Sequence, residues 1–389
     1  MMKNTASLIP AFILSILSSA AFATTGGDNP VVFKKPYPLS AEISASEKIG
    51  AVVMDTGFSQ ASPVAIASVL VQGEMPEAGL ELQLLVEDKF LFFDTSAKFS
   101  PAKVKLFPNG RFWARFDLAE ATRSPLRLKA INRGVKAAHT LIIYEVEAMT
   151  SSPQGEDKSR TGDGADVTGT VPPREQSIYL PRELPFQLVR RAEWKAAPPK
   201  ENYEAHTPAR ITFHHTAGRK PASVAAAYAE VQFIQDYHMN GKKWNDIGYH
   251  FLVDPFGTIF EGRPVGVIGA HVLYRNPNNI GVSVLGNYHP PVSDQPDFLS
   301  LAGIVDVGHY LAGAYAMPPA EFFGHRDLGA SSCPGDHLYA YKETLRGAIF
   351  LPPLSGASKE LADLPSPDIT SPALNQLENW GHNTYFDGR

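Results

Sequence analysis

Cys333 is the only cysteine among the 389 residues of the chain, so no disulfide bond can form within it. The N-terminal residues, described below, predict that the protein is exported. An odd cysteine in an exported protein indicates pairing between chains, a reactive thiol or a metal ligand. The histidines of the chain bear on the third possibility.

Ten of the 12 histidines lie between residues 178 and 352. They are His206, His214, His215, His238, His250, His271, His289, His309, His325 and His337. A catalytic zinc ion needs three protein ligands and one open position, and two imidazoles with one thiolate meet this rule. No HExxH motif occurs, so the ligands must come from separate segments that the fold brings together.

The segments that carry these histidines alternate between strand and helix patterns. Apolar runs at 210–216 and 280–288 predict strands, and 249–262 predicts a hairpin that turns at Asp254 to Gly257. Helical periodicity marks 221–240, 296–316 and 335–350. Asp306 and His309, near the middle of the second of these helices, favour a buried core helix over a membrane span. This half of the chain is therefore predicted to be an α/β domain.

Residues 24–150 differ from it, because short runs of period two are divided by turn residues. They predict an all-β, sandwich-like domain of unknown role, with a hairpin turn at Asn109 and Gly110. Trp113 could stack on a sugar from a solvent-facing position, although packing in the core or between domains is the more common use of an aromatic residue. Contact with the cell wall or with another protein is a possible role for this domain.

The flanking segments predict the destination of the protein. Lys3, the apolar run that follows it and the Ala21-Phe22-Ala23 pattern indicate a signal peptide over residues 1–23, so we expect a periplasmic or secreted protein. Residues 151–177 have the composition of a flexible linker, and 353–389 form a C-terminal tail. A net charge of −5 argues against nucleic acid as a partner, and no membrane association is expected after removal of the signal peptide.

Six segments of the α/β region, taken together, resemble a known family in their order and spacing. They are "FHHTAG" (213–218), "IQDYHM" (234–239), "WNDIGYHFLVDPFGTIFEGR" (244–263), "GAH" (269–271), "IGVSVLGNY" (280–288) and "GHRDLGASSCPGDHLY" (324–339). The family is that of the zinc-dependent N-acetylmuramoyl-L-alanine amidases, which includes peptidoglycan recognition proteins and phage lysozyme-type amidases. The resemblance covers about residues 180–350, and it implies a zinc amidase domain over 178–352 with a central mixed β-sheet flanked by helices.

The resemblance also implies a set of site residues. His214, His325 and Cys333 would bind one Zn²⁺ per chain, and Tyr249 would be the catalytic tyrosine. The expected substrate-binding residues are His215, His238, His271, Asn276, Lys242, Lys243 and Arg263, of which the last three are basic candidates for the carboxylates of the substrate. Ser331 departs from the phage lysozyme-type pattern, which has a catalytic lysine at this position.

The implied function is hydrolysis of the amide bond between the muramyl lactyl group and L-alanine, with peptidoglycan or muropeptides as the partner. The main alternative is a non-catalytic recognition protein that only binds peptidoglycan. A zinc peptidase acting on another amide, and a wall-binding protein whose β domain is the main functional part, are further alternatives.

Overall fold

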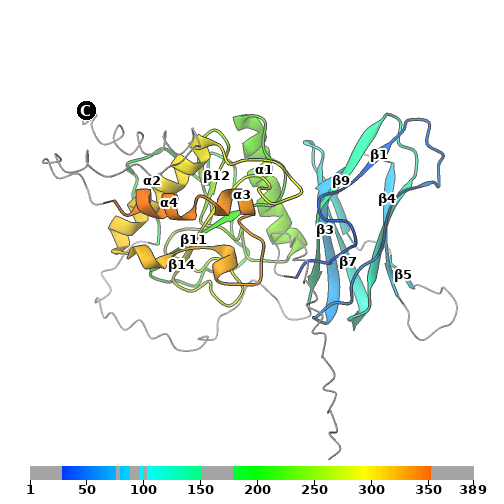
Figure 1. The fold of residues 1–389 in the computed structure, drawn as a ribbon, viewed down its shortest axis with the longest axis horizontal. Helices are drawn as coiled ribbons and strands as arrows, with labels where there is room; N and C mark the ends of the chain where they lie inside the picture. Colours follow the sequence, from blue (N-terminus) through cyan, green and yellow to red (C-terminus); the bar gives the residue numbers. More distant parts are fainter. Residues whose placement is uncertain (1–28, 76–78, 88–96, 100–102, 151–177, 352–389) are drawn as a thin grey trace, which may run out of the picture.

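The computed structural model describes residues 29–75, 79–87, 97–99, 103–150 and 178–351. The predicted signal peptide, linker and C-terminal tail lie outside these residues. Figure 1 shows two parts, which we call the β part (described residues up to 150) and the α/β part (residues 178–351). No helix in the described ranges is long and apolar enough to cross a membrane.

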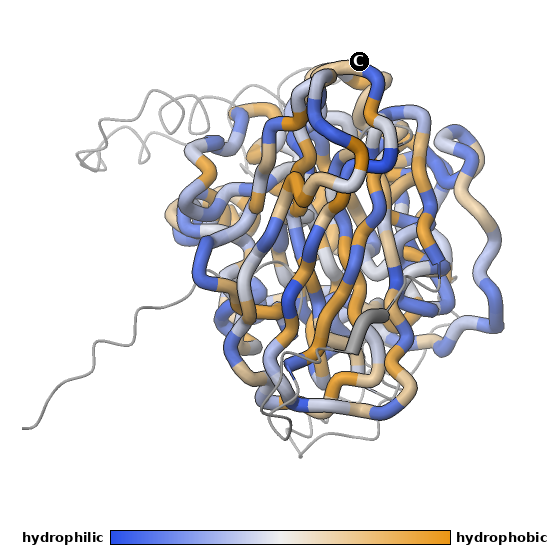
Figure 2. The backbone as a smooth tube through the Cα atoms, turned by 90° about the vertical axis from the view of Figure 1, so that its right-hand side faces the viewer, coloured by the Kyte–Doolittle hydropathy of each residue, from blue (hydrophilic) through white to orange (hydrophobic). Residues whose placement is uncertain are grey.

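The β part consists of two antiparallel sheets. Their strands are β1 (Leu39–Ile43), β2 (Val52–Phe58), β3 (Ile66–Glu74), β4 (Leu80–Val86), β5 (Ala97–Phe99), β6 (Lys103–Leu106), β7 (Arg111–Thr122), β8 (Leu126–Asn132) and β9 (His139–Met149). One sheet has the order β1-β9-β3-β7-β6 and the other β2-β8-β4-β5. Hydropathy alternates along the strands in Figure 2, because successive side chains point to opposite faces of a sheet. Apolar side chains from both sheets share one core, which includes Val69, Leu84, Phe116 and Leu128.

The α/β part contains the mixed sheet with flanking helices that the resemblance implied. The strand order is β10 (Leu188–Val189), β13 (Ile259–Glu261), β12 (Phe251–Val253), β14 (Asn279–Val284), β11 (Arg210–His215) and β15 (Phe322–Gly324). Only the β12–β13 pair of this sheet is antiparallel, and it forms the predicted hairpin.

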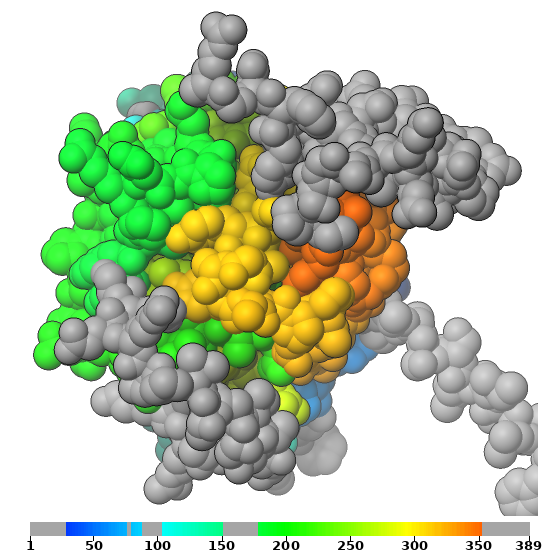
Figure 3. Space-filling view, turned by 90° about the vertical axis from the view of Figure 1, so that its left-hand side faces the viewer, coloured from blue at the N-terminus to red at the C-terminus, as the bar shows by residue number. Residues whose placement is uncertain are grey.

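Helices cover both faces of this sheet. On one face lies α1 (Val224–Asp236), which begins where the Ser223 side chain accepts a hydrogen bond from the Ala226 backbone N–H and continues into a π-helical turn, η1 (Tyr237–Gly241). The other face packs against α2 (Phe298–Tyr315) and α4 (Lys342–Ile349), with the short helix α3 (Asp336–Tyr339) before α4. In Figure 3, α2 and α4 lie side by side on the face of the molecule opposite the β part.

The two parts share an apolar cluster. Leu70, Trp113 and Met149 of the β part pack in it with residues of α1 that include Val231 and Phe233. The Trp113 side chain is fully buried, and its Nε1–H donates a hydrogen bond of 2.9 Å to Asp236 Oδ1. Trp113 therefore occupies the contact between the two parts and does not face solvent as a sugar-stacking residue would.

Candidate metal centre and active-site cleft

Adjacent parallel strands bring His214 and His325 together. Residues 211–213 of β11 are in register with residues 322–324 of β15, so His214 and His325 occupy the next step of the same register. His214 is near the end of β11, and His325 begins the 3₁₀ turn η3 (His325–Asp327) directly after β15. Their rings lie 4.8 Å apart between centroids. This is the carboxyl end of the strands, where α/β sheets commonly place their ligands.

The loop after η3 carries Cys333 back to this point. Its Sγ lies 3.5 Å from His214 Nδ1. The loop is held by the backbone N–H of Arg326, which donates to the Cys333 carbonyl oxygen at 2.9 Å, and by the N–H of Cys333, which donates to Ser331 Oγ at 3.1 Å. Ser331, at the position of the missing lysine, therefore shapes the loop that holds the cysteine.

The ligand atoms of His214, His325 and Cys333 all lie within 4.8 Å of one another, and the three residues are buried. Tetrahedral zinc with nitrogen and sulfur ligands requires separations of about 3.3–3.6 Å, which the Cys333 to His214 distance already meets. The His215 backbone N–H donates a hydrogen bond to Cys333 Sγ at 3.4 Å. Burial holds the pKa of His214 well below its usual value, so its imidazole is neutral and has a lone pair. The donor set therefore fits Zn²⁺.

A second histidine orients the first one. His214 Nε2 lies 3.0 Å from His271 Nδ1, and His271 Nε2 lies 3.1 Å from the carbonyl oxygen of Asn279. The His271 ring lies directly over Gly281 of β14, where an added Cβ would be 2.7 Å from His271 Cγ. Asn276 Oδ1 accepts hydrogen bonds from the backbone N–H groups of His271 and Val272, which fixes the loop that carries this ring.

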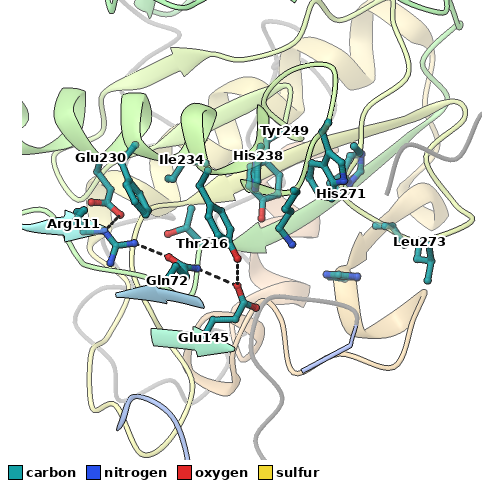
Figure 4. A pocket seen from close by; sticks show the side chains of 17 residues that line it. Gln72, Arg111, Glu145, Thr216, Glu230, Ile234, His238, Tyr249, His271 and Leu273 are labelled. Atoms are coloured by element: carbon teal, nitrogen blue, oxygen red, sulfur yellow. Dashed lines mark hydrogen bonds and ion pairs between the residues drawn. The ribbon is translucent and has the colours of Figure 1, made fainter. Parts of the chain in front are cut away.

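A cleft opens beside these residues (Figure 4). From the α/β part its lining includes His238, Lys242, Tyr249, His271 and His325. The Tyr249 ring is 5.3 Å from the His214 ring and 5.8 Å from the His238 ring, so the predicted catalytic tyrosine lies between the candidate metal centre and η1. Burial lowers the pKa of His238 well below its usual value and that of His271 to about 3, so both rings are neutral.

Four of the predicted substrate-binding residues lie outside this lining. His215 points to the opposite face of β11 from His214, and its Nδ1 accepts a hydrogen bond from the Tyr288 backbone N–H. The buried Arg263 guanidinium donates to the carbonyl oxygens of Ile247 and Ile268.

Asn276 is also buried, and its side-chain oxygen supports the His271 loop. Lys243 is exposed, with a positive φ of 70°. His215, Arg263 and Asn276 make contacts within the protein, and Lys243 lies outside the cleft lining. A substrate contact at any of these four residues remains a prediction.

The cleft also has lining residues that the sequence did not indicate. Gln72, Arg111 and Glu145 reach it from β3, β7 and β9 of the β part. The only feature of the sequence that could have indicated these residues is that they are charged or amide side chains within otherwise apolar strands. That pattern is equally typical of the solvent-facing side of a sheet, so it does not predict a contact with another domain.

The match to a known protein family lies within the α/β part of the chain. Residues 204–336 match a family model described as N-acetylmuramoyl-L-alanine amidase (Amidase_2). The chain is 34% identical over 165 residues to peptidoglycan-recognition protein SC2 of Drosophila melanogaster. This alignment covers 40% of this chain and 84% of that protein. The chain is also 34% identical over 154 residues to peptidoglycan recognition protein 1 of Bos taurus. That alignment covers 39% of this chain and 80% of the bovine protein.

Among solved structures, that of Drosophila peptidoglycan recognition protein SD covers 41% of this chain and 92% of that one, with 28% identity and a TM-score of 0.38. The sequence relationships place residues 204–336 in a family of amidases and peptidoglycan-recognition proteins. The chain belongs to the peptidoglycan-recognition family of Amidase_2 type, as its motifs predicted. Members of this family are either catalytic amidases or non-catalytic recognition proteins.

Proposed function

We propose that this protein is a zinc-dependent N-acetylmuramoyl-L-alanine amidase that hydrolyses the amide bond between the muramyl lactyl group and L-alanine of peptidoglycan. The observation that carries this proposal is the convergence of His214, His325 and Cys333, whose ligand atoms lie within 4.8 Å of one another beside Tyr249. We infer one Zn²⁺ per chain, held by these three residues. A zinc ion in such a site would polarise a carbonyl group and lower the pKa of its bound water toward neutrality.

The residues of the chain have separate roles in this proposal. His271 keeps His214 in the orientation that points Nδ1 toward Cys333. The Tyr249 hydroxyl donates a hydrogen bond to the oxygen that becomes negatively charged during attack on the amide, which is the usual way that a positioned phenol assists acyl transfer. In this proposal Ser331 holds the Cys333 loop, because its hydroxyl oxygen accepts a hydrogen bond from the Cys333 N–H.

The alternative is a recognition protein that binds peptidoglycan without cleaving it. A complete set of two imidazoles, one thiol and a neighbouring tyrosine favours the enzyme, because binding alone requires none of these three ligands. A zinc peptidase acting on another amide would use the same centre, and the products distinguish the two reactions.

Digestion of purified sacculi tests the proposal directly. We expect mass spectrometry to detect free stem peptides that begin with L-alanine. A chelator should abolish their release, and added zinc should restore it. Cys333→Ala should lose both zinc and activity. Wild-type protein that binds one zinc per chain and binds sacculi, but releases no peptide, would identify a recognition protein instead.

We also propose that the protein is exported, because residues 1–23 have the pattern of a signal peptide and the substrate lies outside the inner membrane. N-terminal sequencing of the mature protein should begin at Thr24. Full-length protein that retains Met1 would contradict export by this signal.

A further inference from the structure

The β part packs closely on α1 and η1, the helical segment beside the cleft. Its strand β3 approaches so closely that a Cβ on Gly241 would lie 3.2 Å from Leu70 Cδ1. A Cβ on Gly218 would similarly lie 3.2 Å from Arg111 Nη2. Phe107 of the β part and Phe233 of α1 pack edge to face, with ring centroids 5.2 Å apart. The contact leaves no room for a solvent layer between the two parts at these points.

Ion pairs fix the orientation of this contact. Arg111 Nε lies 3.2 Å from Glu230 Oε1 of α1, and both side chains are 1% exposed. Arg219 Nη2 lies 2.6 Å from Glu74 Oε2, and Lys242 pairs with Glu147 of β9. Because a buried charge left without its partner is costly, these pairs oppose any other docking of the two parts.

The same contact brings a polar surface of the β part to the cleft (Figure 4). Arg111 Nη2 donates to Gln72 Oε1 at 2.7 Å, and Gln72 Nε2 donates to Glu145 Oε2 at 3.1 Å. The Tyr237 hydroxyl of η1 donates to the same Glu145 oxygen at 3.2 Å. We call Gln72, Arg111 and Glu145 the β wall. Its side chains are held in place before any ligand binds.

The cleft carries charged groups of both signs. Arg111 and Glu145 are ionisable groups, and Lys242 and Glu230 line the same cleft from the α/β part. The glycan of peptidoglycan is uncharged, and its lactyl group is neutral where it is amide-linked to L-alanine, whereas the stem peptide carries carboxylates and a free amino group. A cleft lined by groups of both signs suits a ligand that itself carries charges of both signs, because complementary charges favour such a ligand over a neutral sugar.

We propose that the β wall is the part of the substrate cleft that contacts the stem peptide beyond L-alanine, so that the β part determines peptide specificity. This inference rests on the proposed function for the identity of the substrate. It makes Glu145 and Gln72 specificity-determining residues, although they lie outside the amidase-family region.

Two substrates separate this role from catalysis. N-acetylmuramoyl-L-alanine contains the scissile bond without the rest of the stem, and an N-acetylmuramoyl tetrapeptide contains both. For Glu145→Gln we expect a KM at least fivefold higher for the tetrapeptide substrate. We expect less than a twofold change for the short one, with kcat and zinc content unchanged. Equal effects on the two substrates, or no effect on either, would overturn the proposal.

Asp236→Asn is the matched control. Asp236 accepts from Trp113 Nε1 and pairs with Lys105, so it belongs to the same contact between the two parts but does not line the cleft. It should leave both KM values within twofold of wild type. A control that changes KM as much as Glu145→Gln does would show that general weakening of the contact, and not the β wall, is responsible. If Glu145→Gln fails to fold, Gln72→Met provides the same comparison.

Calorimetric titration distinguishes failure of this inference from failure of the proposed function. If the wild-type protein hydrolyses neither substrate, the amidase proposal fails, but the affinity for each ligand still reports on the β wall. Glu145→Gln should then raise Kd for the muramyl tetrapeptide at least fivefold and leave Kd for N-acetylmuramoyl-L-alanine unchanged. An unchanged Kd for the tetrapeptide, or a loss confined to ligands with a longer glycan, would overturn the inference.

Discussion

His214 Nε2 and His271 Nδ1 lie 3.0 Å apart, and this contact sets the protonation of both rings. The carbonyl oxygen of Asn279 can only accept, so His271 Nε2 must carry its proton and donate it. His271 Nδ1 in the neutral ring is then an acceptor for the N–H at His214 Nε2. This leaves the lone pair of His214 at Nδ1, the nitrogen that faces Cys333 Sγ at 3.5 Å.

His271→Leu should therefore weaken zinc binding by about 10- to 100-fold, which is the usual effect of losing a residue that orients a metal ligand. His271→Gln should lose less, because its side-chain oxygen can accept the same proton. Competition with a chromophoric chelator measures the zinc affinity, and the melting temperature of the metal-free protein reports on folding separately. The control is His309→Gln. In the wild-type protein the His309 ring contacts the Ile349 carbonyl oxygen. Wild-type zinc affinity in His271→Leu would contradict this orienting role.

Tyr249→Phe should lower kcat by about 100-fold or more, because it removes a positioned proton donor and leaves the metal ligands intact. Zinc stoichiometry should not change. Tyr288→Phe is a suitable control, since its buried hydroxyl donates to the Leu285 carbonyl at 3.0 Å and does not line the cleft. That variant should lose about 1 kcal/mol of stability and keep its kcat. Equal turnover by Tyr249→Phe and wild type would remove Tyr249 from the mechanism.

Arg111→Met should destabilise the protein by about 3–5 kcal/mol, because it leaves the Glu230 carboxylate buried without its cation. Burial already raises the pKa of Glu230, and the loss of Arg111 raises it further. A group with a raised folded-state pKa loses its stabilising contribution as the pH rises, so the penalty should be smaller at pH 5 than at pH 8.

The double variant Arg111→Met/Glu230→Gln should be more stable than Arg111→Met at pH 8, because it contains no unpaired buried charge. Urea unfolding at both pH values measures these differences. If the losses of unfolding free energy in Arg111→Met and Glu230→Gln simply add in the double variant, Arg111 and Glu230 do not interact energetically.

Asp306 in α2 predicts a pH dependence of stability. Burial raises its pKa from 3.8 to about 7. Between these values the folded state retains a proton that the unfolded state has lost, so the contribution of Asp306 is fully present below pH 4 and is lost as the pH rises through about 7. Asp306→Asn should exceed wild type in stability at pH 8, by about 1–2 kcal/mol because the side chain is only half-buried, and the difference should vanish near pH 4.

Melting temperatures at pH 4 and pH 8 measure this difference. Asp117→Asn, at an exposed position of β7, is the control for replacing an aspartate by its amide. If Asp306→Asn is no more stable than wild type at pH 8, Asp306 does not carry the raised pKa in solution.

Much of the α/β part could be predicted from local pattern and motif order. The apolar run at 210–216 became β11, the hairpin turned where Asp254 and Gly257 indicated, and the mixed sheet flanked by helices is confirmed. Successive side chains of a strand point to opposite faces, and His214 and His215 follow this rule. The strand, the turn and the alternation depend on residues close in sequence, so a local period is sufficient to predict them, whereas the mixed sheet was implied only by the family resemblance.

The approach of the metal-ligand candidates was predictable only through family resemblance. Spacing alone did not choose between His214 and His215, because alternation assigns two faces without saying which one faces Cys333. That choice depends on the register of β11 with β15, which brings His325 beside His214. Such a register joins strands more than 100 residues apart, and no local pattern contains it.

The amino-acid sequence by itself determined the family, the mixed sheet and the three residues that could hold zinc. Tertiary structure alone decided that Arg111, Glu145 and Trp113 of the β part contact α1 and η1 or line the cleft beside them. The physical reason is that period-two alternation separates the two faces of a strand but does not reveal what covers each face. A charged side chain among apolar residues can be stabilised by water or by a partner from another domain, and only the packing of the two parts distinguishes these cases.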